Sequence, residues 1–202
     1  MITTTPPGRL TEDEHLTIER AAEFKSEFFD GEMFAMAGGT PEHSLIATNL
    51  AREMGNGLRG KAGVPSNTDL RVLVEPTGLF TYPDLSVVCD GLKFAPGTDD
   101  TVINPTVLVE VLSDSTEAYD RGKKFEHYRR IPSLRDYLLV SPKEPRVEMF
   151  SRQPDGRWLW QEAAGIDASI ELASLGIRLA LAEIFAHVQF TSAPMRVAPP
   201  RN

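Results

Sequence analysis

The sequence has little cysteine, no long apolar run and no excess of positive charge. Cys89 is the only cysteine among the 202 residues, so neither an intrachain disulfide nor a cysteine-based zinc site can form. A single cysteine without a disulfide partner is typical of proteins from a reducing cytoplasm. No apolar run approaches the roughly 20 residues that span a bilayer, and the N-terminal segment lacks the basic and apolar parts of a secretory signal. We therefore expect a cytoplasmic protein that does not contact a membrane.

Positive charge is scarce overall but concentrated in one segment. The formal net charge is −8 at pH 7, which argues against a protein whose whole surface attracts nucleic acid. Six of the 21 basic residues nevertheless lie between positions 121 and 135, namely Arg121, Lys123, Lys124, Arg129, Arg130 and Arg135. The segment predicts either a local basic patch or an ordinary solvated helix face that neighbouring acids balance.

Length and composition indicate a single globular domain. With 41% hydrophobic residues, the chain is large enough to enclose a core. No internal repeat or shift in composition marks a second domain. We expect one domain over residues 10–190, with flexible tails at 1–9 and 191–202.

Local patterns predict an α/β or α+β fold with a mixed central sheet flanked by helices. The residues TEDE at 11–14 have capping-box spacing, which predicts a short helix that ends near Phe24. The DG pair at 30–31 is typical of a hairpin turn, and a longer helix should follow Thr40. Strands are predicted in DLRVLVE, PDLSVVCD, TVLVEVL, RDYLLVS, PRVEMFS and RWLWQEA, and further helices over about 116–130 and in LALAEIFAHV.

One acid interrupts an otherwise apolar strand. Glu110 lies within TVLVEVL, where an unpaired buried carboxylate would be costly. A salt bridge or an exposed strand end would explain it simply. Asp84, however, follows Pro83 at the start of another predicted strand, and the two carboxylates would meet at one sheet edge if these strands were neighbours. Paired carboxylates suit a divalent cation such as Mg²⁺.

The helix after Glu110 contains two adjacent lysines that point in different directions. At about 100° per residue, one sector roughly 120° wide should face the sheet, because it collects Phe125, Tyr128 and Ile131. Lys124 lies inside that sector, whereas Lys123 lies about 100° away from it. Lys124 is therefore predicted to point inward. The alternative is a surface pair with Asp120 at i,i+4, worth about 0.3–0.5 kcal/mol.

Several separated segments together resemble a known family. YPDLSVV, PTVLVEVLSDST, DRGKKFEHY and RDYLLVSP are similar, in order and spacing, to the Uma-type restriction endonuclease family, a domain-of-unknown-function family of the PD-(D/E)xK nuclease superfamily. SEFFDGEMFAMAGGTPEHSLI and LGIRLALAEIF extend the resemblance to roughly residues 10–188. The resemblance implies a restriction-endonuclease-like fold and a homodimer. It also implies hydrolysis of phosphodiester bonds with Mg²⁺ or Mn²⁺ as the cofactor and DNA as the expected substrate.

The resemblance also implies a metal site and a catalytic cation. Asp84 and Glu110 would bind the metal together with the Val111 carbonyl. The superfamily's simplest pattern has a lysine two residues after the second acid, where this sequence has Leu112. Members of the similar family supply that cation from the next helix, at the position of Lys124.

Other residues complete the predicted site. Glu27 and His43 match family positions near the metal, although a hairpin surface acid and a first-turn helix histidine are the simpler interpretations. Backbone phosphates are predicted to contact basic residues of the charged segment, namely Arg121, Arg129 and Arg130. Tyr128 and Asp120 are predicted to be supporting residues of the site.

Three functional classes remain open on the sequence. The joint presence of Asp84, Glu110 and Lys124 favours a nuclease. Leu112 and the acidic net charge favour a non-catalytic module that binds nucleic acid or protein on a nuclease-like fold. A hydrolase or metal-binding protein acting on a smaller phosphate ester is the third class, because a fold does not define its chemistry.

Overall fold

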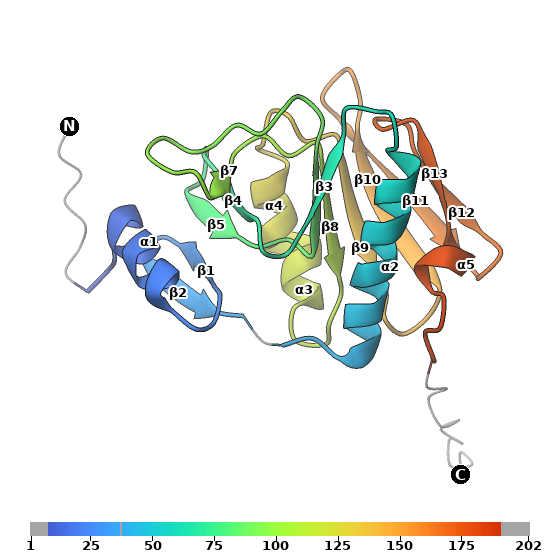
Figure 1. Cartoon of the computed structure of the whole chain (residues 1–202), viewed down its shortest axis with the longest axis horizontal. Helices are drawn as coiled ribbons and strands as arrows, with labels where there is room; N and C mark the ends of the chain where they lie inside the picture. Colours follow the sequence, from blue (N-terminus) through green and yellow to red (C-terminus); the bar gives the residue numbers. More distant parts are fainter. Residues whose placement is uncertain (1–7, 37, 191–202) are drawn as a thin grey trace, which may run out of the picture.

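The computed structural model describes residues 8–36 and 38–190 (Figure 1). Its helices are α1 (Glu12–Ala21), α2 (Pro41–Gly57), α3 (Glu117–Tyr119), α4 (Phe125–Tyr128) and α5 (Leu181–Ile184), with a π-helical segment η1 (Asp120–Lys124) between α3 and α4. Its strands are β1 (Ser26–Phe29), β2 (Glu32–Ala35), β3 (Val64–Asn67), β4 (Arg71–Val74), β5 (Leu79–Thr81), β6 (Leu85–Val88), β7 (Thr101–Val102), β8 (Val107–Val111), β9 (Asp136–Val140), β10 (Arg146–Arg152), β11 (Trp158–Ala164), β12 (Ser169–Leu172) and β13 (Ile177–Ala180). The predicted tails, apart from residues 8 and 9, lie outside the described residues.

The strands form two larger sheets and one hairpin. The six-stranded sheet has the order β11-β10-β9-β8-β6-β3, and β8 and β9 are its one parallel pair. The five-stranded sheet has the order β2-β1-β5-β4-β7, in which β4 and β7 are parallel. Strands β12 and β13 pair with each other. The mixed sheets and the helices around them confirm the predicted α+β fold.

Helices cover the six-stranded sheet on both faces, and β8 lies between them (Figure 1). Successive side chains of a strand point to opposite faces. Val109 accordingly packs in the apolar cluster that contains Leu50 of α2. Leu108 and Leu112 pack in the cluster that contains Tyr128 of α4. Glu110 therefore points to the α4 side, which confirms that this strand is covered on both faces.

Most predicted elements are confirmed, and the differences lie mainly at their ends. Thr11 caps α1 through the expected capping box, but the helix ends at Ala21 and not near Phe24. The hairpin turn is confirmed, with Asp30 at φ 50° and Gly31 at φ 81°. Strand β6 begins one residue after Asp84.

Two predicted helices differ from the structure, and several strands were not predicted. The helix expected over 116–130 consists of α3, η1 and α4, so its middle turn is π-helical. The last helix is only four residues long, because the first two residues of LALAEIFAHV belong to β13 and the last four follow the end of α5. The sequence patterns did not identify β3, β5, β7, β12 and β13. None of the helices in the described ranges is long and apolar enough to cross a membrane.

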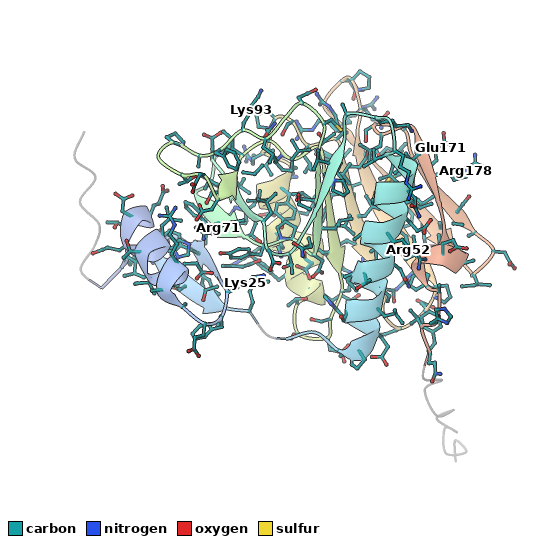
Figure 2. The ribbon with its side chains drawn as sticks, in the orientation of Figure 1. Lys25, Arg52, Arg71, Lys93, Glu171 and Arg178 are labelled. Atoms are coloured by element: carbon teal, nitrogen blue, oxygen red, sulfur yellow. The ribbon has the colours of Figure 1, made fainter. Side chains whose placement is uncertain are left out.

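The N-terminal hairpin joins the rest of the molecule at β5. Strand β1 pairs with β5 through Phe28 and Phe80, while α1 and β2 lie toward one end of the molecule (Figure 1). Lys25 and Arg71, labelled in Figure 2, lie at this junction. Lys25 contacts Asp69, and Arg71 donates a hydrogen bond to the Tyr82 hydroxyl. The pairing with β5 and the Lys25 contact hold β1, and with it Glu27, in this position.

Candidate active site

Strands β6 and β8 bring the two predicted metal ligands to the same place. They are antiparallel neighbours with Leu85 opposite Val109, so Asp84 and Glu110 come next along the same register. The Asp84 carboxylate accepts a hydrogen bond of 2.7 Å from the Val111 N–H. The two strands are thus neighbours, as the predicted pairing of the two carboxylates requires.

Lys124 is buried among three carboxylates. Its Nζ lies 2.9 Å from Glu110 Oε1, 2.9 Å from Glu27 Oε1 and 3.5 Å from Asp120 Oδ1. Only 4% of Lys124 is exposed, whereas Lys123 is an exposed residue. The predicted orientation of the two lysines is confirmed. Lys124 and Asp120 form an i,i+4 pair as the alternative supposed, but the pair is buried inside the site.

Two hydroxyl groups hold the carboxylates of Glu27 and Glu110 by hydrogen bonds. The Tyr128 hydroxyl donates to Glu110 Oε1 at 2.7 Å, and the Thr81 hydroxyl donates to Glu27 Oε1 at 2.6 Å. The two hydroxyl oxygens lie 3.4 Å apart. Tyr128 thus contacts one of the predicted metal ligands, and its supporting role stays a prediction. Thr81 was missed because β5 is too short to produce a pattern.

Tyr119 was also missed, and the π-helical segment explains its position. Residues five apart are brought together in a π-helix, and Tyr119 lies five residues before Lys124. Its ring centroid is 5.9 Å from Lys124 Nζ. Burial, followed by the nearby Glu27 charge, raises the pKa of Tyr119 above its usual value. The phenol therefore stays protonated beside the lysine.

The cluster contains more acids than bases. Burial is the main reason that the pKa of Glu110 is raised to about 8, with the Lys124 charge opposing this and the Asp120 and Asp84 charges adding to it. Burial also raises the pKa of Asp120. Although burial acts to lower the pKa of Lys124, the charges of Glu110, Glu27 and Asp120 raise it well above its usual value. Lys124 is therefore charged, and the acids around it favour a further cation.

His43 joins this cluster from the first turn of α2. Thr40 caps the helix by accepting a hydrogen bond from the His43 backbone N–H, and the imidazole Nε2 lies 3.2 Å from Asp84 Oδ2. The hydrogen bond to Asp84 raises the pKa of His43, with burial acting in the opposite direction. The backbone of Val111 hydrogen-bonds the same imidazole. Gly39 leaves room for the ring, since a Cβ there would lie 2.8 Å from His43 Nδ1.

The three predicted phosphate-binding arginines do not lie together. The Arg121 guanidinium donates to Glu148 at 2.7 and 2.8 Å and to Glu117 at 2.9 Å, so two carboxylates already neutralise it. Arg129 and Arg130 are exposed residues that follow α4. This segment leads into β9, whose first residue pairs with Val107 at the opposite end of β8 from Val111.

The donor atoms present fit a hard divalent cation. The described side chains contain no preformed cage of three or more His, Cys, Asp or Glu residues. Mg²⁺ does not need one, because it usually takes one or two carboxylates and completes its shell with water and substrate phosphate. Asp84, Glu110 and the Val111 carbonyl are oxygen donors of this kind, and the carboxyl groups of Glu27 and Asp120 lie beside them around Lys124.

Comparison with known proteins gives consistent matches over most of the chain. The model of the Uma2 family, described as "Putative restriction endonuclease", matches residues 12–182. An uncharacterised protein from Synechocystis sp. is 37% identical over 185 residues, covering 92% of this chain and 96% of that protein. A second from the same organism is 34% identical over 168 residues, covering 83% and 95%.

A solved structure shares the fold. The crystal structure of "a putative nuclease belonging to DUF820" from Anabaena variabilis matches with a TM-score of 0.72, covering 89% of this chain and 99% of that chain. The sequence identity is 19%, so this match concerns the fold alone.

Proposed function

The chain belongs to the Uma2 family, and from this membership we propose that it is a metal-dependent nuclease that hydrolyses phosphodiester bonds, with DNA as the expected substrate. The observation that carries the proposal is the buried Lys124. It contacts Glu110 directly, and Glu110 is the register neighbour of Asp84. A cation from the helix thus stands beside the paired acids that would bind the metal.

Each residue of the site has a distinct task in this proposal. Asp84, Glu110 and the Val111 carbonyl would hold Mg²⁺ or Mn²⁺, which when bound polarises the phosphate and lowers the pKa of a water molecule. Lys124 would orient the attacking water or neutralise the charge that develops on the phosphate oxygens. The reaction adds water across a P–O bond, and the departing oxygen takes up a proton.

The remaining residues act through these groups as positioning residues. Glu27 holds Lys124 from the hairpin, and Thr81 fixes the Glu27 carboxylate. Tyr128 orients Glu110, and His43 orients Asp84. Such supporting contacts matter because catalytic groups must be held close to their productive geometry.

A non-catalytic binding module is the second candidate. Leu112 occupies the position of the superfamily lysine and packs in the apolar cluster of α4, with 3% of it exposed. Lys124 is already bound to three carboxylates. A protein that had lost catalysis would retain the fold and still bind nucleic acid or protein.

An activity assay on the purified protein separates the two candidates. Single-stranded, double-stranded and supercoiled DNA and RNA are incubated with Mg²⁺ or Mn²⁺, with Asp84→Ala as the inactive control and Lys123→Ala as the neutral one. We expect cleavage by the wild type and by Lys123→Ala, and none by Asp84→Ala. No cleavage by the wild type with either metal would leave the binding module as the better account. Equal cleavage by all three proteins would instead contradict the assignment of Asp84 to the active site. The homodimer implied by the resemblance is tested separately by analytical ultracentrifugation.

A further inference from the structure

Arginines gather at the end of α4, away from the acids of the candidate site. The group consists of Arg129, Arg130, Arg135 and Arg152 and is called the arginine cluster below. Arg152 Nη2 donates to the backbone carbonyls of Arg129 at 2.6 Å and Ile131 at 2.9 Å. The Arg152 backbone N–H donates to the Arg135 carbonyl at 2.7 Å. These bonds join the loop after α4 to the end of β10.

The cluster differs from most other cations of the described residues in that its side chains form no ion pair, although Glu126 lines a pocket beside Arg129 and Arg130. Within residues 8–36 and 38–190, none of its four members takes part in an ion pair, whereas Arg121 and Lys143 each contact two acids. Arg129, Arg130 and Arg135 are exposed. Burial, followed by the Arg135 charge, lowers the pKa of Arg152, as expected where like charges lie close together. The arginine cluster is therefore a region of positive charge on a chain whose net charge is −8.

A pocket and an aromatic side chain lie next to these charges. The pocket has a volume of about 320 Å³ and is lined by Pro76, Thr77, Glu126, His127, Arg129 and Arg130. Arg152 stacks over the Trp158 ring, 4.8 Å from its centroid. Charge at a helix C-terminus can simply offset the helix dipole, which would account for Arg129 and Arg130. Arg152 serves the same helix end through its bonds to the carbonyls of Arg129 and Ile131. Neither role accounts for Arg135, which is exposed beyond the helix.

We propose that the arginine cluster anchors the phosphate backbone of a polynucleotide at a distance from the bond to be cleaved. In assigning a nucleic acid as the occupant, this inference rests on the proposed function. Lys124 at the site and Arg130 in the cluster are six residues apart, or roughly 9 Å at 1.5 Å per residue. That span corresponds to roughly three nucleotide steps at about 3.4 Å each. The substrate is therefore a chain of several nucleotides and not a small phosphate ester.

The anchoring is tested by binding in the absence of turnover. A fluorescent 12-nucleotide single-stranded DNA is titrated with the full chain in a buffer with a metal chelator, so that no cleavage occurs, and anisotropy is recorded at several salt concentrations. The test variant is Arg129→Ala/Arg130→Ala/Arg135→Ala. The matched control, Arg59→Ala/Lys93→Ala/Lys123→Ala, removes the same formal charge from exposed residues elsewhere, including Lys93, which is labelled in Figure 2. Thermal unfolding verifies that both variants fold.

The expected result is a tenfold or greater loss of affinity in the test variant, with a log–log salt slope shallower by about 2. The control should lose less than twofold, and a triple arginine-to-lysine variant should retain most of the binding. A three-nucleotide DNA should bind much more weakly than the 12-nucleotide strand. Equal losses in the test and control variants would overturn the inference, as would wild-type protein that does not bind.

Competition identifies the occupant. Poly-glutamate or anionic phosphatidylserine vesicles that displace the DNA at equal charge concentration would overturn the nucleic-acid assignment in favour of an acidic protein or a lipid surface. Binding and cleavage fail separately in this design. Absence of cleavage by the wild type with retained DNA binding would contradict only the proposed function, whereas retained binding by the test variant would contradict only the role of the arginine cluster.

Discussion

Replacing Lys124 by alanine should destabilise the protein far more than replacing its neighbour Lys123. The substitution leaves the carboxylates of Glu27, Glu110 and Asp120 buried without their cation. Removing one partner of a buried ion pair typically costs about 3–5 kcal/mol. This is a large part of the roughly 5–15 kcal/mol that stabilises a domain. For a chain of this size it corresponds to a fall of about 6–20 °C in the unfolding temperature.

The assay is thermal unfolding of both variants and the wild type between pH 5 and pH 8. Protonation removes the penalty of an uncompensated carboxylate, so the deficit of Lys124→Ala should be greatest at pH 8 and smaller at pH 5. The double variant Lys124→Met/Glu110→Gln should recover part of the loss, because it removes one of the acids together with the cation. Equal unfolding temperatures for Lys124→Ala and Lys123→Ala across this range would refute the buried cluster. Loss of activity in Lys124→Ala must therefore be measured at a temperature where the variant is folded.

Two other predictions concern histidines. His15 is fully buried and stacked on Phe28, and burial lowers its pKa to about 4. Between pH 6.5 and pH 4 the imidazole therefore takes up a proton in the unfolded chain but not in the folded one. The free energy of unfolding should fall by up to about 3 kcal/mol over this range. Urea unfolding should show a flatter profile for His15→Leu, and an unchanged profile would contradict the assignment. Gly39→Ala should displace the His43 ring and lower cleavage activity tenfold or more with less than about 1 kcal/mol change in stability, whereas Gly38→Ala, whose Cβ would contact nothing within 4 Å, should leave activity unchanged. Equal activity in the two glycine variants would show that the ring position is unimportant.

Features encoded by short-range contacts could be predicted from the sequence. The capping box of Thr11 and the turn at Asp30 each depend on residues within four positions of one another. The inward direction of Lys124 followed from its apolar neighbours in the same helix. Asp84 and Glu110 were identified as a pair because the acids stand out against apolar strands, although their proximity depended on the strand order.

Features that depend on long-range pairing could not be predicted. Strand β5 has three residues and β7 has two, too few to show alternation, so the position of Thr81 opposite the hairpin acid was hidden. Arg121 was expected to be available for phosphate, but its partner Glu148 comes from β10, 27 residues further along the chain. The π-helical segment that brings Tyr119 to the lysine has no local signature in the sequence.

A metal titration tests the central claim most directly. Isothermal titration calorimetry with Mg²⁺ and Mn²⁺ is performed on the wild type, on Asp84→Ala and on Glu110→Ala. Asp167→Ala is the control, since that acid is an exposed residue between β11 and β12, outside the site. The wild type and the control should bind the metal, and binding should disappear in both site variants, because each removes one of the two carboxylates at the junction of β6 and β8. Unchanged affinity in both Asp84→Ala and Glu110→Ala would contradict the assignment of these residues as the metal centre.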